Sequence, residues 1–134
     1  MKYIQSNLCS YTKLREDQHK FVFHASNREA LKEWANHVEE LQLQHQWYNR
    51  SLMRLFIDAR SSVGLSVRAF FEYLSDYNRP YPQLTPPHIR IAFLHSPHFE
   101  VKDVYQQFAD LMTVPTTIKF FEEEAKAMEW LQSE

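Results

Sequence analysis

The chain has 134 residues, of which 44% are hydrophobic and 24% charged, and its formal net charge is −2. These values are typical of a soluble globular protein, and we expect one domain spanning residues 1–134. Lys and Arg are spread along the chain, which argues against nucleic-acid binding because such a surface needs clustered positive charge.

Two scarce residue types exclude several kinds of site. Cys9 is the only cysteine, so an intrachain disulfide and a cysteine-based zinc site are excluded. Gly64 is the only glycine, whereas the GxGxxG and Walker phosphate-binding loops need several. We find no apolar run long enough for a transmembrane segment and no secretory signal, so we expect a cytoplasmic protein.

The first segment predicts a β-hairpin. Residues 2–9 form a weak strand, residues 11–18 a polar turn, and residues 20–25 (KFVFHA) a second strand rich in aromatic and branched side chains. The short connection favours antiparallel pairing. We expect His24, near the end of the second strand, to be satisfied at the sheet edge rather than catalytic.

The next segment predicts an amphipathic helix. Ser26 and Glu29 fit a capping box, in which each side chain accepts a hydrogen bond from the other's backbone N–H. Behind this box, apolar residues recur at spacings of three and four and define one buried stripe. The stripe consists of Ala30, Leu31, Trp34, Ala35, Val38 and Leu41.

The most apolar strand is predicted from about Ser51 to Ala59. Its apolar residues are nearly continuous rather than alternating, which is typical of a parallel strand buried on both faces. An amphipathic helix is predicted to follow and to end near Asn78, with Pro80 just beyond it. Residues 79–88 (RPYPQLTPPH) form a stiff, proline-rich connector.

The rest of the chain repeats this alternation. Residues 89–95 predict another buried strand, and Ser96-Pro97 then predicts the start of a helix. Residues 116–121 predict the last strand, and residues 122–131 the last helix, which is acidic in its first turn. The core positions predicted in that helix are Ala125, Met128 and Leu131.

This order of elements, β-β-α-β-α-β-α-β-α, indicates an α/β fold. Strands that alternate with helices are typical of right-handed crossovers between parallel strands. We therefore predict a mixed, mostly parallel five-stranded sheet with about four helices, in which the first strand is antiparallel to the second.

The chain resembles the STAS domain, the fold of the anti-sigma factor antagonist SpoIIAA, and more closely the bacterial SpoIIAA-like proteins, described as STAS/SEC14-like. Three segments carry the resemblance: residues 55–58 (LFID), residues 90–93 (RIAF), and residues 119–131, a strand and a helix ending in Ala-x-x-Trp-Leu. The resemblance covers most of the chain, roughly from residue 20 onward. It implies a sheet with helices mainly on one face and a role in binding or regulation rather than catalysis.

The loop after the central strand is the candidate recognition surface, because ligands and partners of open α/β sheets meet the carboxyl ends of the strands. Arg60 offers a donor fork suited to a carboxylate or a phosphate, and Gly64 indicates a position where a side chain is costly. An ordinary structural βα loop is the alternative. The candidate binding residues, here and after the next strand, are Asp58, Arg60, Ser61, Ser62, Gly64, His95 and His98.

The resemblance also nominates a phosphorylation site. In phosphorylated STAS proteins, an Asp-Ser-Ser-Gly-like turn presents a serine at a helix start, and Ser61 and Ser62 are the matching positions. This chain departs from that pattern, because two residues separate Asp58 from Ser61 and Val63 separates Ser62 from Gly64. A helix N-terminus favours a phosphate, but Ser61 or Ser62 would equally serve as a helix cap.

We therefore expect a non-enzymatic, STAS-like regulatory or binding module that engages a protein partner or a small apolar, lipid-like ligand through this loop. A homodimer is a further expectation, and we assign no catalytic residue, metal or cofactor. The alternative is a small hydrolase or metal-dependent enzyme that uses Asp58 and His95 at one edge of the sheet. Against it, the GxSxG nucleophile elbow is absent.

Overall fold

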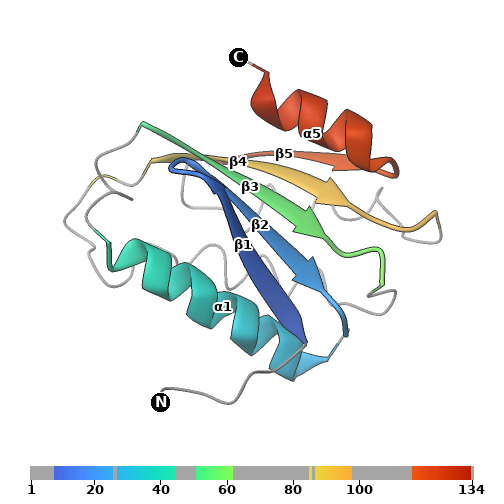
Figure 1. Ribbon diagram of the computed structural model, residues 1–134, viewed down its shortest axis with the longest axis horizontal. Helices are drawn as coiled ribbons and strands as arrows, with labels where there is room; N and C mark the ends of the chain where they lie inside the picture. The colour runs from blue at the N-terminus through green and yellow to red at the C-terminus, as the bar shows by residue number, and fades with distance from the viewer. Residues whose placement is uncertain are drawn as a thin grey trace.

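A computed structural model of the chain describes residues 8–25, 27–44, 51–61, 85, 87–97 and 116–133. Its centre is a five-stranded sheet in the order β1-β2-β3-β4-β5 (Figure 1). β1 is antiparallel to β2, and the other neighbouring strands are parallel. The strands are β1 Cys9–Arg15, β2 Gln18–Phe23, β3 Leu52–Asp58, β4 His88–Leu94 and β5 Thr116–Phe121.

The N-terminal hairpin has the predicted antiparallel pairing but different boundaries. Residues 11–15, predicted to lie in the turn, belong to β1, and the turn is reduced to Glu16 and Asp17. β2 begins at Gln18 rather than at residue 20, and the predicted strand residues 2–7 lie outside the described residues. Residues 11–15 were predicted to form a turn because their side chains are mostly polar and charged. β1 is an edge strand of the sheet, and an edge strand can carry such side chains.

The helix that follows is α1, Arg28–Gln42, and its predicted apolar stripe is confirmed. Ala30, Leu31, Trp34, Val38 and Leu41 are buried, whereas Ala35 is half-buried. The N-cap is Asn27 rather than Ser26. The Asn27 Oδ1 atom accepts a hydrogen bond from the Ala30 backbone N–H at 2.9 Å, and Ser26 is outside the described residues.

The second described helix is α5, Glu124–Gln132, which starts two residues after the predicted position. Its buried residues are Ala127 and Leu131, while Met128 is half-buried. Ala125, predicted to face the core, is exposed. The error arose because a helix at this spacing can be rotated by one position without losing an apolar stripe, and only contact with the sheet fixes its rotation.

The two described helices lie on opposite faces of the sheet (Figure 1). α1 covers one face through a large apolar cluster, and α5 covers the other through a smaller cluster of Phe56, Ala92, Leu94, Ala127 and Leu131. The arrangement with helices mainly on one face is therefore not seen for α1 and α5. The strand residues of the α1 cluster include Phe21, Phe23, Leu55, Ile57, Ile91 and Phe93.

Burial on both faces explains the continuous apolar sequence of the central strands. In β3, the consecutive residues Leu55, Phe56 and Ile57 are all fully buried, with Phe56 facing α5 and its neighbours facing α1. The predictions of β3, β4 and β5 are confirmed. The helices predicted after β3 and β4 lie outside the described residues, and no described helix is long and apolar enough to cross a membrane.

Candidate functional site

Asp58 is the last residue of β3, and its carboxylate is held by Arg60. The Arg60 guanidinium donates from Nε to Asp58 Oδ1 at 3.1 Å and from an Nη atom to Oδ2 at 2.8 Å. The Arg60 backbone N–H donates to the same Oδ1 atom at 3.2 Å. Three donors thus bind one buried carboxylate, in the forked geometry for which arginine is suited.

This pairing sets the protonation of Asp58. Burial by itself would raise the pKa of the carboxyl group, but the hydrogen bonds and charge of Arg60, with a contribution from Lys20, lower the pKa below its ordinary value of 3.8. The Asp58 carboxylate is therefore ionised at neutral pH. A carboxylate in that state accepts hydrogen bonds but cannot act as a general acid.

Arg60 also connects the loop to the C-terminal helix. The same Nη atom that contacts Asp58 donates to Glu124 Oε1, in the first turn of α5, at 3.1 Å. Lys20 Nζ lies 3.9 Å from the other oxygen of Glu124. The start of the loop after β3 is therefore fixed by an ionic network that joins three elements, while the side chain of Arg60 remains 45% exposed.

His95 directly follows β4, and its backbone lies close to that of Asp58 on the neighbouring strand. The side chains of His95 and Asp58, however, lie on opposite faces of the sheet. Asp58 pairs in register with Leu94, and the Ala59 backbone N–H donates to the Leu94 carbonyl oxygen at 2.8 Å. Since successive side chains of a strand alternate, Asp58 shares the face of Phe56 and α5, whereas His95 shares the face of Phe93 and α1. The expectation that these side chains converge is therefore wrong.

The contacts of His95 agree with this placement. Its ring packs against Phe120, which borders the α1-side cluster, with centroids 6.2 Å apart. Its Nδ1–H donates to the carbonyl oxygen of Ser96 at 2.8 Å. His95 thus uses one ring nitrogen to hold the loop that follows its own strand.

The remaining candidates are only partly described. Ser61 is exposed directly after Arg60. Ser62, Gly64 and His98 lie outside the described residues. Among the residues that the structure does describe, no group of three or more His, Cys, Asp or Glu side chains could hold a metal ion.

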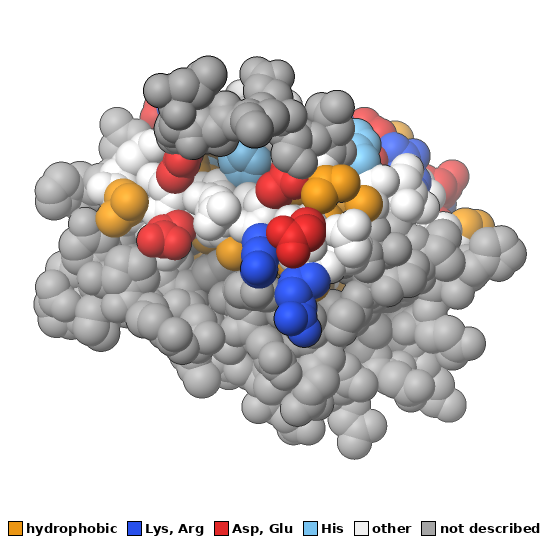
Figure 2. Space-filling view, turned by 90° about the horizontal axis from the view of Figure 1, so that it is seen from below, with side chains coloured by type: hydrophobic (Ala, Val, Ile, Leu, Met, Phe, Trp, Pro, Cys, Tyr) orange, Lys and Arg blue, Asp and Glu red, His pale blue; other side chains and the backbone are white. Residues whose placement is uncertain are grey.

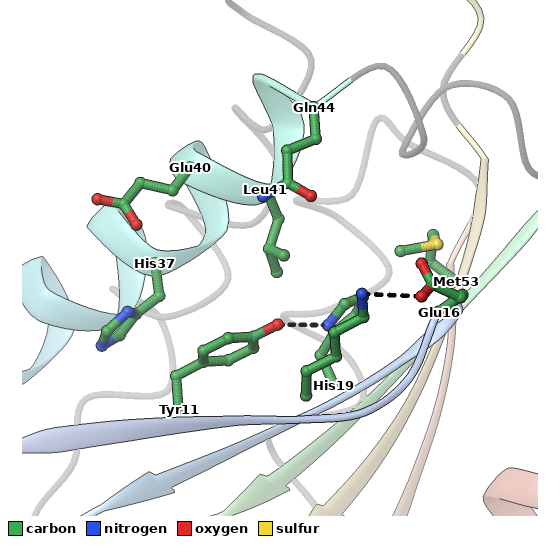
Figure 3. Close-up of a pocket in the computed structure, with 9 residues that line it drawn as sticks. Tyr11, Glu16, His19, His37, Glu40, Leu41, Gln44 and Met53 are labelled. Atoms are coloured by element: carbon green, nitrogen blue, oxygen red, sulfur yellow. Dashed lines mark hydrogen bonds and ion pairs between the residues drawn. The ribbon is translucent and has the colours of Figure 1, made fainter.

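The sequence analysis did not predict a cavity that lies between α1 and the β1–β2 hairpin, near the end of the sheet where β2 and β3 begin. Its volume is about 240 Å³ (Figure 3). Tyr11, His19 and Met53 line it from the sheet, and Glu16 lines it from the hairpin turn, while Lys13 contributes from β1. The residues lining it from the α1 side are His37, Glu40, Leu41 and Gln44.

Aromatic and imidazole rings are linked within this cavity. Tyr11 Oη lies 2.8 Å from His19 Nδ1, and the Tyr11 ring stacks with His37 at a centroid distance of 5.6 Å. Burial, followed by the charge of Glu16, raises the pKa of Tyr11, so its hydroxyl stays protonated at neutral pH. His37 Nε2–H donates to the Cys9 carbonyl oxygen at 3.2 Å, which ties α1 to β1.

The sequence contained one signal for this cavity. His37 is three residues after Trp34 and four before Leu41, so it borders the predicted buried stripe of α1. Tyr11 gave no comparable signal, because the predicted hairpin boundaries placed it in a turn.

The outer surface on the side where α1 lies carries interspersed acidic, basic and polar side chains among its described residues (Figure 2).

Comparison with known proteins agrees with this architecture. The family model described as SpoIIAA-like matches residues 20–132, which is most of the chain and includes the greater part of β2 and all of β3–β5, α1 and α5. No curated protein and no solved structure was found to match the chain. On the strength of this match, together with the mostly parallel five-stranded sheet, the chain belongs to the SpoIIAA-like family.

Proposed function

We propose that this SpoIIAA-like domain is a non-enzymatic regulatory module that binds a protein partner through the loop after β3. The observation that carries the proposal is the ionic network of Asp58, Arg60 and Glu124. It fixes the start of the loop on a rigid scaffold and leaves Arg60 and Ser61 exposed. Loops of this kind, held at the base and polar at the tip, are common recognition surfaces.

The network also limits what Arg60 can contribute to the binding of a partner. Part of its donor fork is occupied by Asp58 and Glu124, so Arg60 presents a partly neutralised guanidinium to a partner rather than an isolated cation. An acidic or phosphorylated partner gains less from such a group than from an unpaired arginine. Shape and polar contacts at residues 60–61 are therefore the main source of recognition in this proposal.

The alternative of a hydrolase or metal-dependent enzyme is less well supported by this geometry. A catalytic pair needs its two side chains within hydrogen-bonding reach of a common substrate, and Asp58 and His95 point to opposite faces of the sheet. Asp58 is in addition bound by three donors from Arg60.

A matched pair of substitutions tests the proposal. Ser61→Asp places a negative charge in the loop after β3. Ser51→Asp makes the same change at an exposed position directly before β3, at the opposite end of that strand. In quantitative affinity capture from cells that express the chain naturally, we expect Ser61→Asp to reduce recovery of the partner that wild type retains. We expect Ser51→Asp to behave as wild type.

Melting temperatures control for folding, because surface changes usually alter stability by less than about 0.5 kcal/mol. Equal partner recovery by wild type and Ser61→Asp, with equal melting temperatures, would exclude the loop as the recognition surface. Arg60→Ala is a poor probe of binding here, since it also removes the two side-chain donors of the buried Asp58 carboxylate.

A further inference from the structure

A cluster of cationic and hydroxyl side chains lies where β3, β4 and β5 begin, at the end of the sheet opposite the loop after β3. Arg54, Arg90 and Thr117 are register partners on these three strands, so their side chains lie side by side on the face that α5 covers. His88 shares this face because it is two residues before Arg90. Ser133, directly after α5, completes what we call the Arg90 cluster.

The Arg90 cluster has an excess of positive charge. Arg54 forms an ion pair with Asp17, whereas Arg90 is half-buried and forms no ion pair with any described residue. Burial lowers the pKa of Arg90, the charge of Arg54 lowers it further, and no described carboxylate acts in the opposite direction. Two guanidinium groups against the one carboxylate of Asp17 leave one positive charge in excess. A cation that is removed from water is costly unless an anion compensates it.

Arg90 retains donors that its contacts within the fold do not use. One Nη atom donates to the Trp130 carbonyl oxygen at 2.6 Å and to Ser133 Oγ at 2.8 Å. The Nε–H is shielded from solvent and has no partner among the described residues. The other Nη atom makes no hydrogen bond within the described part of the chain, and Nε is the only nitrogen of this side chain that is both shielded and unpaired. Donors therefore remain for a ligand at the surface.

Two exposed side chains next to Arg90 can bind the same ligand. Thr117 Oγ1 lies 2.8 Å from His88 Nε2, and both residues are exposed. When the ring nitrogen donates in this contact, the Thr117 hydroxyl keeps its own hydrogen for another acceptor. A guanidinium group beside a hydroxyl is a common donor set for the oxygens of a phosphate.

The C-terminal end of α5 does not repel an anion as a bare helix end would. Its carbonyl oxygens at Trp130 and Leu131 accept hydrogen bonds from Arg90 and Arg54, which offset the negative end of the helix dipole. We propose that the Arg90 cluster binds the phosphate group of a small phosphomonoester. The free Nη atom of Arg90 and the Thr117 hydroxyl donate to the phosphate oxygens, and Arg54 adds its charge from the neighbouring strand.

Inorganic phosphate is the probe, with sodium chloride and sodium acetate as controls at matched ionic strength. In protein NMR, phosphate is expected to cause saturable shifts at the Arg90 Nε–H, the His88 ring and the Thr117 amide. A Kd on the order of several mM is expected, because each exposed ionic contact contributes little. Chloride is expected to cause no saturable shift. Acetate is expected to bind at least about threefold more weakly, since it has fewer oxygens and a smaller charge.

Two matched pairs of variants locate the binding. Thr117→Val is expected to weaken phosphate binding about threefold, while Thr116→Val, on the adjacent residue and the other face of β5, leaves it unchanged. Arg90→Gln and Lys119→Gln each remove one positive charge, and Lys119 is exposed two residues after Thr117. Arg90→Gln is expected to abolish the saturable shifts, and Lys119→Gln is expected to retain them.

Equal affinity of the Thr117→Val and Thr116→Val proteins would overturn the inference, and this pair decides the outcome if Arg90→Gln does not fold. Equal binding of phosphate and acetate, no saturable binding of phosphate, or an equal loss in Arg90→Gln and Lys119→Gln would also overturn it. Shifts confined to residues 58–61 would place the phosphate elsewhere. The Ser61→Asp protein is expected to bind phosphate as wild type does, so this inference and the proposed partner-binding loop succeed or fail separately.

Discussion

Arg60 holds the carboxylate of Asp58 with both its side chain and its backbone N–H. Asp58 is only 7% exposed, so an unpaired charge at this position would be costly. This single pairing connects the sequence pattern, an acid followed two residues later by an arginine, to the rigidity of the loop. It also makes the stability of the fold sensitive to acid.

We expect Arg60→Ala to lower the free energy of unfolding at pH 7 by about 1–3 kcal/mol, since a buried carboxylate loses charge-assisted hydrogen bonds. Arg60 holds the pKa of Asp58 below 3.8 in the folded state, so its stabilising effect is present above pH 3.8. That effect is lost as the pH falls through the lowered pKa of the folded protein. Urea denaturation of both proteins between pH 7 and pH 3 should therefore show the difference shrinking toward the acidic end.

Lys32→Ala is the control for this experiment. Lys32 pairs with Glu29 at 3.9 Å on the exposed surface of α1, and such pairs contribute less than about 1 kcal/mol. A loss in Arg60→Ala that is the same at every pH, or no larger than the loss in Lys32→Ala, would contradict the assigned role of the Asp58 pairing.

The C-terminal helix α5 is capped both by its own C-cap residue and by strand residues. Ser133 donates to the Trp130 carbonyl oxygen from its backbone N–H at 3.1 Å and from its hydroxyl at 2.7 Å. The last turn of α5 contains no basic residue. Positive charge comes from the sheet, where Arg54 Nε donates to the Leu131 carbonyl oxygen at 2.9 Å, and an Arg90 Nη atom donates to the Trp130 carbonyl oxygen at 2.6 Å. Arg54 and Arg90 are register partners on β3 and β4, so two adjacent strands place their positive charges at the negative end of the helix dipole.

Arg90 also stacks its guanidinium on the Trp130 ring, 4.2 Å from the centroid. We therefore expect Arg90→Lys to weaken the docking of α5, because an ammonium group cannot reproduce a planar, stacked and forked contact. Hydrogen exchange should show faster exchange of the amides of α5, by a factor corresponding to about 1–2 kcal/mol, and unchanged exchange in α1. Arg15→Lys, at an exposed position of β1, should leave both helices unaffected, and equal protection of α5 in all three proteins would refute this role.

The whole molecule has two apolar clusters, one on each side of the sheet. Val38 on α1 and Leu131 on α5 belong to different clusters, and both are fully buried. Because the sheet separates them, we expect Val38→Ala and Leu131→Ala to destabilise the fold additively, within about 0.5 kcal/mol, in chemical denaturation. Leu131→Ala alone should cost about 2–5 kcal/mol.

A pair on one face provides the contrast. Phe21 and Trp34 are in the same cluster, with ring centroids 6.3 Å apart, so Phe21→Leu and Trp34→Phe should couple by about 0.5 kcal/mol or more. Equal coupling in the two pairs would mean that the sheet transmits changes in packing from one face to the other.

Several features of this protein were determined by local sequence. The continuous apolar runs of β3 and β4 predicted buried parallel strands, and the spacing of Trp34, Val38 and Leu41 predicted the buried face of α1. The resemblance of residues 20 onward to SpoIIAA-like proteins is confirmed by the family match. These predictions succeeded because burial on both faces of a strand imposes a continuous apolar run, and burial along one stripe of a helix imposes a spacing of three and four; local sequence reveals both patterns.

Tertiary structure decided the remaining features. Whether Tyr11 belongs to a turn or to an edge strand depends on pairing with β2, and the rotation of α5 depends on its contact with the sheet. Asp58 and His95 lie on opposite faces of the sheet because Asp58 pairs with Leu94 and His95 is one residue further along. A shift of one residue in the pairing of the strands would place both side chains on the same face. The cavity is built from α1, the hairpin and β3, so no continuous segment of sequence contains it. Its existence was decided by long-range packing, because only that packing brings Tyr11 and His37 into contact.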